Sequence, residues 1–106
     1  MNKARLFFRI ILTSLCLLIS NAAYAANADV EAGRVVSTQC ASCHGPDGEG
    51  NDGMPKSCIS CMDADTFIKH INDFKSGSRK NFMMEMFAKR LSNQDIENLA
   101  AYYATK

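Results

Sequence analysis

The sequence lacks an excess of charge of either sign. Its 106 residues include 12 Lys and Arg against 11 Asp and Glu, which gives a formal net charge of +1. It also lacks a basic patch interleaved with aromatic residues, the pattern typical of chains that bind nucleic acid. We therefore expect no nucleic-acid partner.

A long hydrophobic run is absent as well. The longest apolar stretch, residues 10–19, is about half of the roughly 20 residues that a membrane-spanning helix needs. Three basic residues precede it, Lys3, Arg5 and Arg9. Ala23-Tyr24-Ala25 follows it and has the small-x-small pattern that signal peptidase recognises. A membrane anchor is the alternative, but this order of features favours a signal peptide over residues 1–25, cleaved after Ala25, with export to the periplasm and no membrane span afterwards.

The rest of the chain, residues 26–106, is too short to hold two cores. Domains of this size commonly need a metal, a disulfide or a cofactor to complete a core. The sequence has five cysteines, of which Cys16 is expected to leave with the signal peptide. The other four are expected to reach an oxidising compartment, so each should be assigned to a disulfide, a cofactor bond or a free thiol.

Two of these cysteines form the motif Cys40-Ala41-Ser42-Cys43-His44. Thiols three residues apart on one helical turn can each add to a porphyrin vinyl group, and the histidine that follows can then bind the iron. A distant second cysteine pair would suggest zinc, and a cytosolic chain would suggest redox-active thiols, but the immediate His44, the export signal and the small size all favour haem. The motif therefore predicts one covalently attached haem c; an incidental CxxCH that holds a disulfide is the alternative.

The periodicity around this motif predicts short helices. A first helix is expected from Asp29 to about Gln39, with Val30, Gly33 and Val36 or Ser37 on one side. Residues 45–53 contain four glycines and predict a loop that can lie against a porphyrin edge.

Two more helices are expected downstream. Asp63 or Asp65 can cap one of them, and Gly77 marks its end. The other begins with a capping box at residues 92–95. Their core faces are predicted to be Phe67, Ile68, Ile71 and Phe74 in the first, and Ile96, Leu99, Ala100 and Tyr103 in the second. Gly33 with Ala100 and Ala101 would permit a close crossing of the terminal helices.

The iron needs a sixth ligand or an open site. Methionine raises the reduction potential and suits an electron carrier. Five methionines follow the expected cleavage site, namely Met54, Met62, Met83, Met84 and Met86. The cluster 83–86 lies far enough downstream of His44 to reach the opposite haem face, and spacing alone does not choose within it. His70 is a further candidate, with a solvated rim position as the alternative.

At this point the sequence resembles the class I cytochromes c over essentially all of residues 26–106. The matching segments are Cys40 to Gly45, Met54-Pro55-Lys56, Asp73 to Arg79, Met84 to Leu91, Leu91 to Ile96, and Leu99 to Tyr103. The resemblance implies an all-α fold of short helices wrapped around one covalent haem. It implies Met84, seven residues before Leu91, as the second axial ligand with His44. It also implies that the Pro55 carbonyl accepts a hydrogen bond from His44.

Within that class, residues 62–67 and 73–77 look most like the cytochrome subunit of flavocytochrome c sulfide dehydrogenase. This closer resemblance implies an FAD-containing, sulfide-oxidising protein as the electron donor, with no catalysis by the cytochrome itself. A free-standing soluble electron carrier is the second interpretation. A haem enzyme or gas sensor with an open iron site is the third.

The second cysteine pair, Cys58 and Cys61, departs from the class I pattern. Met62 follows it where a second haem attachment site would need histidine, so only one haem is expected. A local disulfide formed during export is the plainest interpretation of the pair. A redox-active pair and two unpaired thiols are the alternatives.

Overall fold

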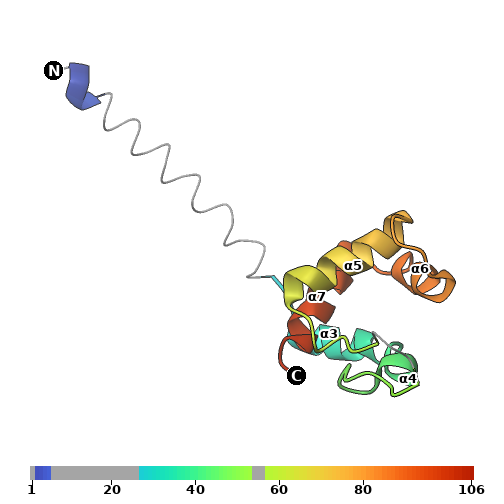
Figure 1. Ribbon diagram of the computed structural model, residues 1–106. Helices are drawn as coiled ribbons and strands as arrows, with labels where there is room; N and C mark the ends of the chain where they lie inside the picture. Colours follow the sequence, from blue (N-terminus) through green and yellow to red (C-terminus); the bar gives the residue numbers. More distant parts are fainter. Residues whose placement is uncertain (1, 6–26, 54–56) are drawn as a thin grey trace.

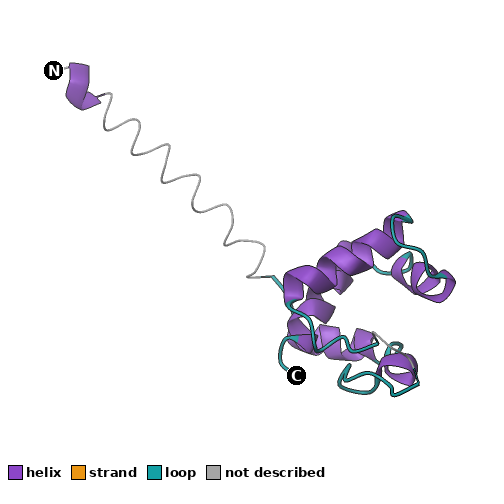
Figure 2. Ribbon diagram, viewed as in Figure 1, coloured by secondary structure: helices purple, strands orange, loops and turns teal. Residues whose placement is uncertain are grey.

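The computed structural model describes residues 2–5, 27–53 and 57–106 (Figure 1). Residues 27–106 contain α3 (Val30–Ser37), α4 (Ala41–His44), α5 (Ala64–Ser76), α6 (Phe82–Ala88) and α7 (Asn93–Tyr103). The described chain is drawn as helix and loop alone in Figure 2, which confirms the expected all-α class. Within these residues, no helix has both the length and the apolar character needed to cross a bilayer.

The first helix, α3, leads directly into the CxxCH motif. It starts at the predicted place, because the Asp29 side chain accepts a hydrogen bond from the Ala32 amide at 3.0 Å. It ends at Ser37, two residues before the predicted end at Gln39. The amides of residues 38–40 bond carbonyls three residues back, which tightens the chain into a turn before α4. This hydrogen-bonded turn joins the motif directly to α3.

The terminal helices α3 and α7 cross at Gly33. A Cβ atom at this position would lie 2.0 Å from the Asn98 carbonyl oxygen and 2.9 Å from the Tyr102 Cβ. The predicted close crossing is therefore present, but the residues that meet Gly33 are Asn98 and Tyr102 rather than Ala100 and Ala101. The reason is rotational register, since Ala100 turns toward the core and is buried.

The helix α5 begins and ends at residues predicted from the sequence. Asp63 Oδ1 accepts a hydrogen bond from the Thr66 amide at 2.8 Å. Hydrogen bonds from the Thr66 amide and the Thr66 hydroxyl lower the pKa of the Asp63 carboxyl. At the other end, Gly77 adopts a left-handed conformation with φ of 82°, which favours glycine.

The last helix, α7, supplies much of the core. Ser92 and Asp95 form the predicted capping box. Ile96 and Leu99 are each 1% exposed, and they pack with the predicted inner face of α5. The buried apolar cluster consists of Ile59, Phe67, Ile71, Phe74, Ala88, Leu91, Ile96, Leu99, Ala100, Tyr102 and Tyr103.

The helix α6 is not among the helices expected from the sequence. Asn81 caps it, because its Oδ1 accepts a hydrogen bond from the Met84 amide at 3.0 Å. Glu85 Oε1 in turn accepts a bond from the Asn81 amide at 3.2 Å. This local signal could have been recognised in the sequence. In Figure 1 the helices follow a C-shaped course, with α4 at one end and α6 at the other.

Candidate functional site

The last four residues of the CxxCH motif form the single helical turn of α4, and the first, Cys40, directly precedes it. Cys40 is the residue before the helix, and its carbonyl accepts a hydrogen bond from the His44 amide at 2.9 Å. Both thiols of the motif are free of disulfide bonds; Cys40 is half-buried and Cys43 is exposed. Burial raises the pKa of the Cys40 thiol. The motif thus presents two free thiols and one imidazole from one turn.

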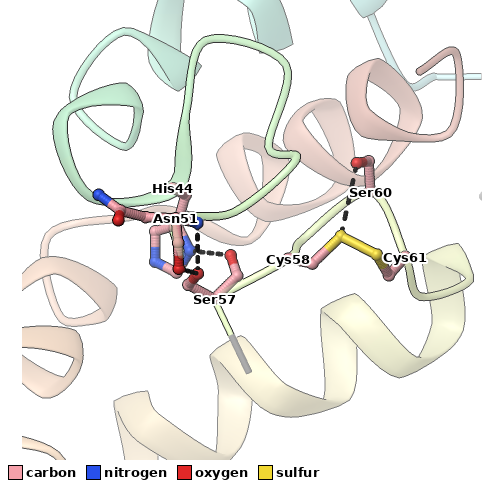
Figure 3. Close-up of a disulfide and its surroundings, with 6 residues drawn as sticks. All are labelled: His44, Asn51, Ser57, Cys58, Ser60 and Cys61. Atoms are coloured by element: carbon pink, nitrogen blue, oxygen red, sulfur yellow. Dashed lines mark hydrogen bonds between the residues drawn. A yellow bond between two sulfur atoms is a disulfide. The ribbon is translucent and has the colours of Figure 1, made fainter. Parts of the chain in front are cut away.

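The His44 ring is oriented by a backbone carbonyl. Its Nδ1 lies 2.5 Å from the carbonyl oxygen of Ser57 (Figure 3). A carbonyl oxygen can only accept, so Nδ1 carries the proton and donates it. Nε2 is the ring nitrogen left for another partner, and no hydrogen bond within the described residues engages it. An imidazole whose Nδ1 is held by a backbone carbonyl is oriented to bind a metal ion through Nε2.

The partner predicted for His44, the Pro55 carbonyl, lies outside the described residues. The carbonyl that the structure places against Nδ1 belongs to Ser57. Sequence reasoning missed Ser57, because any residue can supply a backbone carbonyl.

Ser57 is itself held by the loop that follows His44. Its Oγ accepts a hydrogen bond from the Asn51 amide at 2.8 Å. The Gly50 amide donates to the His44 carbonyl oxygen at 2.8 Å, which closes the loop back onto the motif. Gly50 has φ of 94°, and a Cβ atom there would lie 3.0 Å from Ser57 Oγ. The glycine-rich loop thus brings Ser57 to the histidine, although 13 residues separate them.

The second cysteine pair forms a disulfide next to Ser57. The bridge joins Cys58 to Cys61, with Cα atoms 5.4 Å apart (Figure 3). Between them, the amides of Ile59 and Ser60 both donate to the Gly48 carbonyl oxygen, at 2.7 and 3.0 Å. Ile59 enters the core. The pair is therefore part of the same framework that orients His44.

The methionines of α6 differ in their surroundings. Met84 is half-buried and packs against the core. It lies four residues before Ala88, which is completely buried, so the two share the inner face of the helix. Met83 is 49% exposed, and Met86 is half-buried.

The other candidates for the sixth ligand lie elsewhere. Met62 is half-buried and packs against the core cluster. His70 is half-buried on α5, directly before the buried Ile71. Met54 lies outside the described residues.

Tyr103 of α7 adds a polar atom to the site that sequence reasoning assigned only to the core. Its hydroxyl is buried and has no hydrogen-bond partner within the described residues. Burial, followed by the neighbouring Cys40 thiol, raises the pKa of Tyr103. A buried and unpaired donor beside a motif cysteine suits a cofactor held at that cysteine.

Comparison with known proteins shows the family of the chain. Residues 27–102 match the family described as cytochrome c oxidase, cbb3-type, subunit III. The chain is also 36% identical over 72 residues to cytochrome c-553 of Helicobacter pylori, covering 68% of this chain and 75% of that protein. The chain belongs to the class I, mono-haem cytochromes c.

Other relatives of the cytochrome are larger. Cytochrome c4 of Stutzerimonas stutzeri is 41% identical over 69 residues, covering 59% of this chain but only 32% of that protein. The cytochrome subunit of sulfide dehydrogenase of Chlorobaculum tepidum is 32% identical over 71 residues, covering 67% of this chain and 63% of that protein. The chain thus spans about a third of the cytochrome c4 it matches.

As a member of this family, the cytochrome carries one covalently bound haem c. The side chains of the site fit this group. Two free thiols can form the thioether bonds, and the imidazole beside them has a free Nε2. The unpaired Tyr103 hydroxyl lies beside the first of these thiols.

Proposed function

We propose that this cytochrome transfers single electrons, with haem held by thioether bonds from Cys40 and Cys43 and with His44 as the proximal iron ligand. The observation that carries the proposal is the His44 ring, whose Nδ1 is committed to Ser57 while Nε2 is free. The haem iron supplies the chemistry, because it alternates between the ferric and ferrous states by gaining or losing one electron. The protein's residues hold the ligand geometry constant between the two states.

We propose Met84 as the distal ligand. It is carried by α6, at the opposite end of the C-shaped course from α4 (Figure 1). Its position on the inner face of α6 supports it over the more exposed Met83. The resemblance to class I cytochromes, in which the ligand stands seven residues before the opening of the last helix, supports the same residue.

Replacement of Met84 by alanine tests this proposal. We expect the ferric wild-type protein to show the weak near-infrared charge-transfer band that reports sulfur bound to iron, and Met84→Ala to lose it. The midpoint potential should fall by about 59 mV or more, a tenfold change for one electron, because thioether ligation favours the ferrous state. Optical spectra and a potentiometric titration measure both effects.

Met83→Ala and Met86→Ala are matched controls on the same helix, and both should keep the band. Loss of the band in either control, with retention in Met84→Ala, would reassign the ligand. Absence of the band from the wild-type protein would favour His70 or an open iron, and with it a catalytic or gas-sensing role.

The place of action and the processing of the chain belong to the same proposal. We propose that residues 1–25 are a signal peptide and that residues 26–106 form the mature periplasmic cytochrome. The basic start, the short apolar run and Ala23-Tyr24-Ala25 support this. The cleavage position and Cys16 lie outside the described residues.

We further propose an FAD-containing, sulfide-oxidising protein as the electron donor. The similarity to a protein named the cytochrome subunit of sulfide dehydrogenase supports this partner. The cytochrome is then expected to co-purify with a flavoprotein when isolated from its own periplasm through an affinity tag. Sulfide should reduce the haem in that complex and leave the isolated cytochrome oxidised on the same timescale. A cytochrome that purifies alone and accepts electrons only from small diffusible donors would instead be a free-standing carrier.

A further inference from the structure

The disulfide lies one residue away from the group that orients the haem ligand. Ser57 accepts the hydrogen bond from His44, and Cys58 follows it directly in the chain (Figure 3). Ser57 is fixed on its Oγ side by the Asn51 amide. On the other side of Ser57, the Cys58–Cys61 bridge restrains the chain that follows it.

The bridge is accessible to thiols on one side. Cys61 is exposed, whereas Cys58 is half-buried, with its Sγ 3.9 Å from Ser60 Oγ. Exposed disulfides are the ones that thiols open most readily. A bridge between residues three apart closes a very short loop, so it contributes little to folding through chain entropy. We therefore look for a role of the bridge other than stabilising the fold.

We propose that Cys58 and Cys61 form a thiol-exchange site for dithiols, and that its state sets the reduction potential of the haem through the Ser57–His44 hydrogen bond. This inference rests on the proposed role of His44 as the iron ligand. Ser57 and the bridge act as positioning elements, because they reach the iron only through His44.

The exchange is a two-electron reaction with a dithiol as the reductant. A thiolate of the dithiol attacks Cys61 Sγ and forms a mixed disulfide, while the Cys58–Cys61 bond breaks and Cys58 leaves as a thiolate that takes up a proton. The second thiol of the dithiol then attacks the mixed disulfide and releases Cys61. The dithiol becomes a cyclic disulfide, and the protein gains two thiols.

Opening the bridge should weaken the hold on His44. The chain after Ser57 loses its covalent restraint, and within the described residues this segment is then held by the Asn51 contact to Ser57 Oγ and by the contacts of Ile59 and Ser60 to Gly48. A longer hydrogen bond from Nδ1 leaves the imidazole a poorer electron donor to the iron. Since ferric iron needs that donation more than ferrous iron, the midpoint potential should rise.

The test uses the mature holoprotein and dithiothreitol as the dithiol. The protein is treated anaerobically, which also reduces its haem iron, and is then freed of dithiothreitol, assayed for thiols and titrated potentiometrically. We expect two new thiols and a roughly tenfold shift of the haem equilibrium toward the ferrous form, which corresponds to about 59 mV upward for one electron. Reoxidation of the bridge should restore the original potential.

Two variants complete the design. Cys58→Ser with Cys61→Ser should have the raised potential without any treatment and should not respond to dithiothreitol. Ser60→Ala removes the hydroxyl next to Cys58 but keeps the bridge, so it should behave like the wild-type protein.

Two results would overturn the inference. One is the appearance of two thiols without any change in potential, which would separate the bridge from His44. The other is a bridge that dithiothreitol does not open in the folded protein, which would exclude thiol exchange. If the double serine variant does not fold, the treated wild-type protein decides between these outcomes. Failure of the proposed function is recognised earlier, because the untreated protein would then lack covalent haem or a histidine-ligated iron spectrum.

Discussion

Serine at both Cys40 and Cys43 will leave the protein without covalently bound haem. Each thiol is expected to supply one thioether bond, and serine cannot form it. Both thiols are free of disulfides, one turn from His44. Haem-dependent staining after denaturing electrophoresis should fall to background, and acidified organic solvent should extract any residual haem. Because a domain this small depends on its cofactor for a complete core, the apoprotein should also lose its cooperative melting transition.

The matched control for this experiment is within the same chain. Cys58→Ser with Cys61→Ser removes an identically spaced pair that is followed by Met62 rather than by histidine. This variant should keep its covalent haem in full. Haem that stays attached when Cys40 and Cys43 are replaced, but is lost with Cys58 and Cys61, would move the attachment site to the second pair.

Replacement of Gly33 by alanine will destabilise the fold by about 3 kcal/mol or more, at the upper end of the usual cost of overpacking a core. The added Cβ atom would lie 2.0 Å from the Asn98 carbonyl oxygen, a backbone atom that cannot turn aside as a side chain can. The helices α3 and α7 must then separate, which disturbs the core around Leu99 and the approach of Tyr103 to Cys40. Denaturant unfolding of the holoprotein measures the loss.

Gly53→Ala is the control for this prediction. Among the described residues, a Cβ atom at Gly53 would meet only Asn51 Oδ1, at an ordinary contact distance of 3.6 Å. The change should therefore alter the unfolding free energy by no more than about 0.5 kcal/mol, as is usual for surface substitutions. Equal losses for the two variants would mean that glycine content, rather than the helix crossing, governs stability.

Much of the local structure could be predicted because its causes lie within a few residues. Asp63 caps α5 and Ser92 caps α7 through bonds to amides three residues ahead, and such spacing is visible in a sequence. The short helix α6 is harder to predict, because its methionine-rich segment also fits a stretch of candidate iron ligands and its only clear local signal is the cap at Asn81. The helix α3 ends two residues before the end that its sequence predicts, because the tight turn after Ser37 has no distinctive composition.

The covalent chemistry of this protein could be predicted from one short motif. Two thiols and an imidazole within five consecutive residues predict covalent haem, since the reacting groups are carried by one turn. The tertiary structure alone decided how that imidazole is held. Ser57, 13 residues away along the chain, contacts His44 through its backbone carbonyl. The backbone carbonyl of Asn98 likewise lies against Gly33. Backbone atoms are the same in every residue, so only the folded chain shows which of them come into contact.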